Sequence, residues 1–460
     1  MPTPRQTFAV KLLTFVVASL LIAFRSHGQE LRVYFGNLHA HSNASDGNHN
    51  TSPADAYRIA REQGGMDFLS LSEHNHLMAS QAVYDGVIAA ANAATTPTFV
   101  ALYGQEYSTI SKGNHANIQN YPIRISPSLN GKYGTVFGTV LPTFTSTNLG
   151  TVVFAEFNHP ESFTKDYGLQ QDFGGDIQAF VQTMDPFVKL IAVASGPADA
   201  NNKNNQATGS DRFVHKDIST SRWFKYLSHG MHLAPKVDHD NHSPTYGFRH
   251  AGRTAVWVRG ALTRDSLVRA LSDRHCYATE DKNLRIIPTL SNGALPGDIV
   301  KGATVPNVTV ALAVNDDDEP SAAYSIELYS GVSGDGQNPS PVSGATQTLS
   351  GNGSASLALQ IDPAASLYYI IHVEQTSNDP VNNSNRSDAW LAPIWFAPGD
   401  GPDGPIDDDD DAIQRFVSSR NSDVYHFPDC RVVSQIAEHN LLTHEGVPEG
   451  KRLHQGCPLN

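Results

Sequence analysis

The sequence is poor in cysteine and in basic residues, and each shortage excludes a class of protein. Only three cysteines occur in 460 residues, and Cys276 has no obvious disulfide partner, which excludes an extensive disulfide framework. The 32 basic residues are outnumbered by 46 acidic ones, so the formal net charge is −14. Because phosphate backbones attract basic surfaces, a general nucleic-acid coat is disfavoured, although bound metal ions could supply positive charge locally. The motif GxSxG is absent, and no Ser-His-Asp arrangement stands out.

Long apolar runs are equally scarce. The single long run spans Leu12–Phe24, comes after Arg5 and Lys11, and is followed by small and polar residues at 25–28. Its length suits the core of a signal peptide and is short for a membrane span. Because no cysteine lies near the expected cleavage site, a lipoprotein anchor is not expected. We therefore expect a signal peptide over 1–28 and a soluble, secreted or periplasmic mature chain without a membrane span. An uncleaved anchor is the alternative.

From residue 29 to residue 284 the chain alternates short apolar strands with helical patterns. The segment 51–65 has the punctuation of a helix, with Ser52 as the N-cap and Pro53 at the first helical position. A second amphipathic helix is expected at 263–274. Expected strands begin at Val33, Met66, Thr98, Gly150 and Val188. This alternation is typical of an α/β fold with a parallel sheet or an α/β barrel.

The composition changes after residue 284. Short β-rich runs at 307–315, 324–330, 354–361 and 367–375 are separated by Asn, Gly, Ser, Pro and Asp, and they predict a β-sandwich domain over 285–397. Two further segments complete the division of the chain. They are an acidic, Gly/Pro-rich linker at 398–412, which has the composition of a solvated spacer, and a separate small module at 413–460.

Potential metal ligands crowd into the stretch NLHAHSNASDG, residues 37–47. Alternate residues of a strand point to the same side, so His39 and His41 can face one ion, and Asp46 is only a short loop away. More ligand-type side chains follow the later strands. They are Glu73, His74, His76, Glu106, His115, Glu156, His159, Asp238, His239, Asp240 and His242.

The repetition of these clusters at successive strand ends indicates a metal site. A single histidine after a strand is more often an ordinary loop residue, but the carboxyl ends of strands are where functional residues of α/β barrels collect. Mixed imidazole and carboxylate ligands suit zinc, manganese or iron, and there are enough of them for more than one ion.

The ordered motifs HxHSxxSDG, EHN, GxE, GNH, NHP and DNH resemble the PHP family, named after its polymerase and histidinol-phosphatase members. The resemblance covers residues 30–282 and extends weakly into the β-rich region. It is greatest to exported bacterial members that carry a β-rich domain behind the catalytic one. The resemblance implies a distorted (β/α)7 TIM-like barrel with three divalent ions in its site.

The resemblance also assigns ligands to each ion. The first ion would be held by His39, His41, Glu106 and Asp240. Glu106 would bridge to a second ion, which would also be held by His115 and His159. The third ion would be held by Asp46, His74 and His242. One departure is visible, because Ser72-Glu73-His74 stands where many members have Thr-Asp-His. The role of Glu73 stays open, and Asp238 and His239 are expected not to bind metal.

This ligand set predicts hydrolysis of phosphate mono- or diesters of small molecules by metal-bound hydroxide. His76 and His239 are candidates for the leaving-group acid, and Arg249 with His250 could clamp a phosphate unless they are ordinary surface residues. Nucleic acid stays open as a substrate but is not favoured. One alternative is a carbamate, amide or ester hydrolase that uses the same metals. The other is a binding protein in which the metals are structural.

The C-terminal module contains the spacing H-x3-C followed by H-x2-C. The four residues are His426, Cys430, His454 and Cys457. They form a plausible tetrahedral zinc set, and the module resembles small Ada-like metal-binding modules in which His454 replaces a usual cysteine. A disulfide between Cys430 and Cys457 is the alternative.

Overall fold

The computed structural model describes residues 30–160, 166–195, 216–249, 251–303, 305–377, 387–399, 415–419, 424–426, 440–445 and 452–453. The expected signal peptide at 1–28 lies outside these residues, as does nearly all of the expected linker at 398–412. Within the described part of the chain, no helix is long and apolar enough to cross a membrane.

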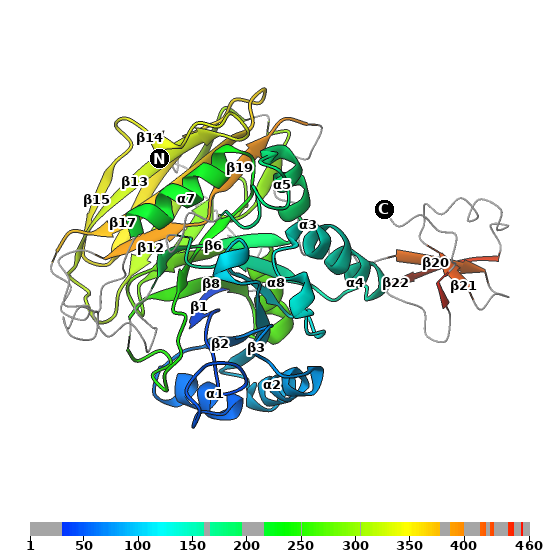
Figure 1. Cartoon of the computed structure of the whole chain (residues 1–460). Coiled ribbons are helices and arrows are strands. Elements are labelled where there is room, and N and C mark those ends of the chain that lie inside the picture. Colours follow the sequence, from blue (N-terminus) through cyan, green and yellow to red (C-terminus); the bar gives the residue numbers. More distant parts are fainter. Residues whose placement is uncertain are drawn as a thin grey trace, which may run out of the picture.

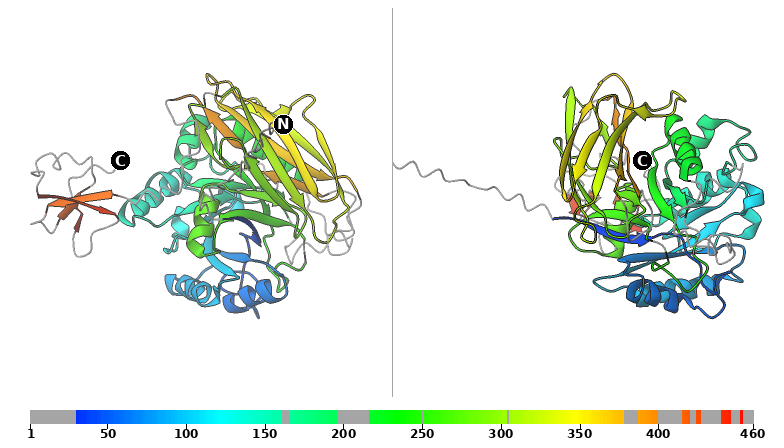
Figure 2. Two further views of the ribbon diagram at one scale, coloured as in Figure 1. Left: turned by 180° about the vertical axis from the view of Figure 1, so that it is seen from behind. Right: turned by 90° about the vertical axis from the view of Figure 1, so that its left-hand side faces the viewer.

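The fold begins with three parallel strands joined by two helices. These are β1 (Leu31–Asn37), α1 (Pro53–Glu62), β2 (Phe68–His74), α2 (Gln81–Ala94) and β3 (Val100–Tyr107). Residues of β2 pair in parallel with both neighbouring strands. The two helices lie side by side at the end of the molecule opposite the β-rich layer (Figures 1 and 2). This part follows the strand–helix alternation that the sequence predicts.

Helix α1 forms for the reasons visible in the sequence. The Ser52 hydroxyl accepts a hydrogen bond from the Asp55 amide at 3.2 Å, and proline occupies the first turn. The helix buries Tyr57 and Ile59 on one face. The later helix α8 (Arg264–Ser272) begins with a reciprocal cap between Thr263 and Ser266. Both predicted helices are therefore confirmed, each shorter than its predicted range.

The alternation breaks after β3. Strand β4 (Ala116–Gln119) runs antiparallel to β3 and to β5 (Phe154–Phe157). Gly113 and Asn114 reverse the chain between β3 and β4 with backbone φ angles of +119° and +93°. Parallel pairing resumes with β5, β6 (Val188–Ser195) and β7 (Ala234–Asp238). The intervening helices are η1 (Ile110–Lys112), η2 (Pro127–Leu129), α3 (Tyr133–Thr135), η3 (Val136–Val140), α4 (Leu141–Thr147), α5 (Ile177–Met184) and α7 (Lys216–Ser228).

The sheet curls so that β7, the last strand in its pairing order, comes back against a strand next to β1. Strand β8 (Arg253–Arg259) pairs antiparallel with β1. The Thr254 hydroxyl of β8 bonds to the backbone of Val237 in β7, with its oxygen 3.2 Å from the amide nitrogen and 3.3 Å from the carbonyl oxygen. The fold is therefore mixed α/β with a curled sheet and few helices, and a regular (β/α)7 barrel is not confirmed.

The sheet continues into the β-rich region through β9 (Cys276–Thr279), which pairs with β8 and with β18 (Asp388–Leu391). Within the described ranges this sheet contains 16 strands. Its remaining members are β11 (Ile299–Lys301), β13 (Ala323–Val332), β14 (Ser340–Pro341), β15 (Gln347–Ser350), β17 (Leu367–Gln375) and β19 (Ile394–Ala397). The expected boundary between 29–284 and 285–397 stays a prediction, and one sheet crosses it.

A second sheet covers this end of the first one. It consists of β10 (Arg285–Leu290), β12 (Asn307–Asn315) and β16 (Gly353–Gln360), all antiparallel. Strand β12 alternates exposed and buried residues, and its buried Val310 and Leu312 share one apolar core with Ile326 of β13. The C-terminal module has its own four-stranded sheet, made of β20 (Arg415–Ser419), β21 (Val424–His426), β22 (Leu441–Glu445) and β23 (Arg452–Leu453).

Candidate metal centre

The histidine-rich stretch after β1 pairs with the segment that follows β7. The His41 amide donates to the Asn241 carbonyl at 2.8 Å, and the Asn241 amide donates to the His39 carbonyl at 3.4 Å. This local parallel pairing places His39 and His41 beside Asp240 and His242, about two hundred residues later in the chain. The curl of the sheet thus brings the two ends of the sequence pattern together.

A first group of ligand atoms surrounds one point. The Nε2 atom of His39 lies 3.1 Å from Nε2 of His41, 3.1 Å from Oε1 of Glu106 and 3.2 Å from Oδ1 of Asp240. Nε2 of His41 lies 3.1 Å from Oδ1 of Asp240 and 3.4 Å from Oε2 of Glu106. One ion with ligands at about 2.1 Å separates neighbouring ligand atoms by roughly 3.0–3.4 Å, so these distances fit a shared ion.

The tautomer of His39 is fixed by a carboxylate on the side of the ring away from the other ligands. Its Nδ1 lies 2.6 Å from Oδ1 of Asp238, and both side chains are fully buried. A carboxylate only accepts hydrogen bonds, so Nδ1 carries the proton and Nε2 presents its lone pair to the group. Burial alone lowers the pKa of His39, but Asp238 and Glu106 raise it well above its usual range. In the metal-free chain Nε2 therefore takes up a second proton, which a bound cation would displace.

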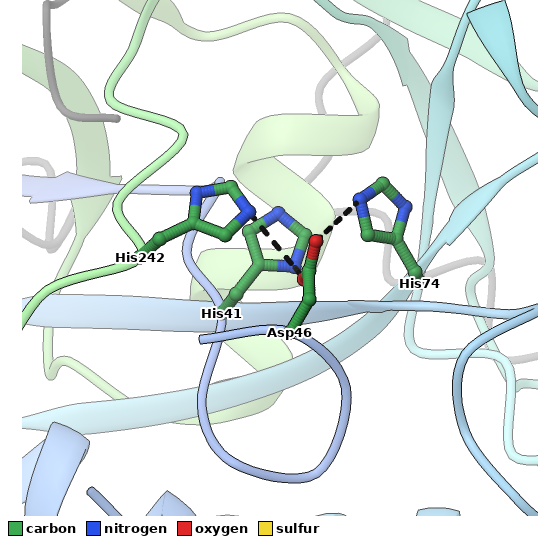
Figure 3. A group of neighbouring side chains, drawn as sticks. All are labelled: His41, Asp46, His74 and His242. Atoms are coloured by element: carbon green, nitrogen blue, oxygen red, sulfur yellow. Dashed lines mark ion pairs between the residues drawn. The ribbon is translucent and has the colours of Figure 1, made fainter. Parts of the chain in front are cut away.

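A second group is centred on the Asp46 carboxylate, which lies between His74 and His242 (Figure 3). Oδ2 of Asp46 is 3.5 Å from Nε2 of His74, and Oδ1 is 3.4 Å from Nε2 of His242. Oδ1 is also 3.6 Å from Nδ1 of His41, so the His41 ring stands between the first and second groups. Burial lowers the pKa of His242, but Asp240 and Asp46 outweigh this effect and raise it to about 10.

A third group forms around Glu106. Oε2 of Glu106 lies 3.0 Å from Nδ1 of His74, and Oε1 lies 2.9 Å from Nδ1 of His115 and 3.2 Å from Nε2 of His159. Among the described residues, the two Nδ1 atoms and Oε2 have no partner in hydrogen-bond geometry, although all three are buried. Leaving buried polar atoms unsatisfied is costly, and a divalent ion accepts their lone pairs. These nitrogen and oxygen atoms therefore fit the coordination of a metal ion.

Burial also changes the charge of the histidines around Glu106. It lowers the pKa of His74 to about 3, so this imidazole is neutral and ready to bind a cation. Burial also lowers the pKa of His159, but the contact with Glu106 outweighs this effect and raises the pKa to about 9. His159 and Asp240 also have positive φ angles of 27° and 47°, which are uncommon for non-glycine residues.

Glu73, whose role the sequence left open, holds the loop that carries Asp46. Its carboxylate accepts hydrogen bonds from the Ser42 amide at 3.0 Å, from the Ser42 hydroxyl, and from the Ser45 hydroxyl at 2.5 Å. Burial raises the pKa of Glu73 to about 7. Glu73 therefore positions a ligand from behind, and it belongs to none of the three ligand groups described above.

The nine predicted catalytic-site ligands thus lie together, and the geometry divides them slightly differently from the prediction. His41 faces both the first and the second group, and His74 faces both the second and the third. The assignment of individual ions to His39, His41, Asp46, His74, Glu106, His115, His159, Asp240 and His242 stays a prediction.

The predicted acid–base and phosphate-binding residues lie at different depths. The His76 ring is half-buried, 5.0 Å from the ring of His74. His239 is buried, with Nε2 2.8 Å from the Gly252 carbonyl oxygen. Arg249 is partly buried, and its amide donates to the Thr245 carbonyl at 3.4 Å. The catalytic roles of all three stay predictions, and His250 lies outside the described residues.

Only the backbone of one predicted tail ligand is described. His426 is the last residue of β21 and pairs with Val417 of β20. Cys430, His454 and Cys457 lie outside the described residues, so the zinc and disulfide alternatives both stay open.

Sequence reasoning overlooked the residues behind the ligands. Asp238, expected to be a bystander, orients His39, and Asn158 donates to Oε1 of Glu106 at 3.0 Å. Lys236 is fully buried in β7 next to both. A lysine flanked by apolar residues in a strand is the signal that could have drawn attention to this layer.

No protein-family model matches the chain, and no curated protein shows significant similarity to it. The resemblance to the PHP family therefore stays a prediction from the sequence motifs.

Proposed function

We propose that the chain is an exported, metal-dependent phosphoesterase of the PHP type that holds three divalent ions. The observation that carries the proposal is the convergence of imidazole and carboxylate atoms, most of them buried, at 2.9–3.6 Å from one another at the ends of successive strands. Such mixed sets suit zinc, manganese or iron. Export is proposed from the apolar run Leu12–Phe24 near the N-terminus.

The chain's own residues would share the work as follows. Glu106 has oxygens facing both the first and the third group, so it is suited to bridge two ions. Asp238 and Glu73 hold His39 and the Asp46 loop in place. Bound divalent ions would supply an acidified water as nucleophile and offset the negative charge of a phosphoryl group.

His76 is the better candidate for donating a proton to the leaving oxygen. It is half-buried beside His74, at the edge of the ligand groups, whereas Nε2 of His239 already contacts a carbonyl oxygen. A general acid must reach the substrate, and a half-buried ring can do so.

We also propose that the curled sheet is a distorted (β/α)7 barrel. The bonds between Thr254 and the Val237 backbone support this reading, because they join the two ends of the β8-to-β7 part of the sheet. The location of all three groups beyond the ends of parallel strands supports it too.

Metal-dependent hydrolysis by the purified mature chain tests the proposal. Substrates would be p-nitrophenyl phosphate, bis-p-nitrophenyl phosphate and a neutral aryl carbamate, with chelated enzyme and His39→Ala as controls. We expect phosphate-ester turnover that both controls abolish. Turnover of the carbamate alone would replace the proposal with a carbonyl hydrolase. Bound metal without any turnover would favour a binding protein.

A further inference from the structure

A layer of buried polar side chains lies directly behind the ligands. Its centre is the Lys236 ammonium group, which is fully buried. Nζ lies 2.5 Å from Oε2 of Glu156, 2.9 Å from Oδ1 of Asn158 and 3.9 Å from Oδ2 of Asp238. Barrel interiors are usually filled with branched apolar side chains, so a lysine at this position needs an explanation.

Two arms lead from Lys236 to metal ligands. The first arm is Asp238, whose Oδ1 contacts Nδ1 of His39 at 2.6 Å. The second arm is Asn158, whose Nδ2 donates to Oε1 of Glu106 at 3.0 Å. Both arms end on members of the first ligand group, and Glu106 also belongs to the third.

The ammonium group fixes the direction of the second arm. An ammonium group only donates hydrogen bonds, so the Asn158 amide must turn its oxygen toward Lys236. Its NH2 group then points to Glu106 and to Oδ1 of Asn117, at 3.0 and 2.7 Å. A neutral side chain at position 236 would leave the amide free to turn its oxygen toward the Glu106 carboxylate, where two acceptors would repel each other.

The same charge supports the first arm. Asp238 is fully buried and faces His39 with one oxygen and Lys236 with the other. Held between the ammonium group and the imidazole, the Asp238 carboxylate accepts a hydrogen bond from His39 and so keeps the His39 proton on Nδ1. Nε2 is thereby kept as the metal-binding atom.

We propose that Lys236 is a positioning residue that orients His39 and Glu106 for metal binding through Asp238 and Asn158. The inference builds on the proposed function, because it assumes that these ligands hold ions. Stability alone is a weak reason for the lysine, because replacing a buried ion pair by neutral residues of similar volume is often neutral or stabilising.

The test compares Co2+ binding by the wild-type chain and the double variant Lys236→Met with Glu156→Gln. The double change removes the buried ammonium group together with the carboxylate nearest to it, and Asp238 keeps its contact with Nδ1 of His39. Equilibrium dialysis gives the number and affinity of ions, and the visible Co2+ spectrum reports ligand geometry. Lys189→Met is the matched control, since Lys189 is a partly buried lysine of β6 that donates to the Asp185 carbonyl at 3.0 Å.

We expect the double variant to bind the ions held by His39 and Glu106 about 10–100-fold more weakly, with an altered spectrum, while Lys189→Met behaves as wild type. Wild-type affinity and an unchanged spectrum in the folded double variant would overturn the inference. A wild-type chain that binds no ion at all would instead overturn the proposed function.

A second variant keeps the inference testable if the double variant does not fold. Asn158→Leu removes one arm and leaves the pair of Lys236 and Glu156 in place. We expect its affinity to fall about tenfold, because the Glu106 carboxylate loses a buried donor. Unchanged affinity in Asn158→Leu would contradict the role of that arm.

Discussion

The two ends of the large sheet have interiors of opposite character. Between β1 and β7 the buried side chains include the ion pair of Lys236 and Glu156 and the amide of Gln119. Between β12 and β13 the buried strand residues are apolar, as with Leu312 and Ile326, and the buried carboxylates of Asp316 and Glu319 lie in the segment that connects the two strands. Buried polar groups cost free energy unless each is satisfied, so a polar interior is retained where ligands need precise support. The comparison separates a region that holds the candidate ligands from one whose apolar core stabilises the fold.

The apolar end also braces the polar one. Phe35 of β1 and Trp257 of β8 belong to the same apolar core as Leu312. Strand β1 leads directly into His39 and His41, so the β-rich region fixes the strand that delivers the first two ligands. This arrangement gives the β-rich region a structural role even without a ligand of its own.

The largest effect is expected from Glu106→Gln at the polar end. The substitution removes the charge that faces His39, His74, His115 and His159, so ions should be lost from two groups. Losing several kcal/mol of transition-state stabilisation lowers kcat/KM by about 10^3-fold or more. Steady-state kinetics with p-nitrophenyl phosphate measures the loss, with Glu327→Gln in β13 as the matched control. Near-normal activity would show that Glu106 is not a ligand.

At the apolar end, Leu312→Ala should act on stability alone. Leu312 is completely buried in β12, and removing its side chain leaves a cavity. The free energy of unfolding should fall by about 2–5 kcal/mol, while metal affinity at a temperature where the variant is folded stays unchanged. Urea denaturation of the metal-free chain measures the change, with exposed Ala313→Ser as the control. A loss of metal affinity would mean that the two ends are coupled.

The polar end should also respond to pH. His159 and His242 have pKa values raised to about 9 and 10, so both carry protons at neutral pH in the metal-free chain. Bound ions must displace these protons, and affinity should therefore rise with pH until about 9–10 and then level off. In the metal-free chain the same protons stabilise the fold fully below about pH 6.5 and cease to do so as pH rises through 9–10.

Calorimetric titration in buffers of different ionisation enthalpy counts the released protons. Metal binding at pH 7 without any proton release would contradict the raised pKa values of His159 and His242.

The smallest effect is expected from Ser45→Ala. Ser45 lies in the loop between β1 and α1, next to Asp46. The Ser45 hydroxyl donates to Glu73, so its loss loosens the loop that carries Asp46. A net cost of about 1 kcal/mol corresponds to roughly fivefold weaker binding of the ion held by Asp46, His74 and His242. Co2+ titration measures it, with exposed Ser111→Ala as the control. An effect on all ions equally would indicate general unfolding of the site.

The grouping of the nine candidate ligands could be predicted because strand ends are readable from short-range patterns. His39 and His41 alternate along a strand, and Glu106 follows an apolar run, so their grouping needed only the assumption that strands lie side by side. The hairpin of β3 and β4 was missed because it depends on left-handed backbone at Gly113 and Asn114.

The supporting layer could not be predicted in the same way. Asp238 meets His39 across 199 residues, and Lys236 meets Glu156 only because β5, β6 and β7 are neighbours in the curled sheet. Contacts of this range follow from tertiary structure, which no local pattern encodes. Glu73 and Asn158 likewise act across strands, since Glu73 of β2 bonds to the loop after β1 and Asn158, after β5, bonds to Glu106 of β3.

Anomalous X-ray diffraction from crystals grown with Mn2+ would test the central claim most directly. The account predicts a peak bounded by His39, His41, Glu106 and Asp240, a second beside His115 and His159, and a third beside Asp46, His74 and His242. Crystals that diffract well and show no anomalous peak among these side chains would contradict it.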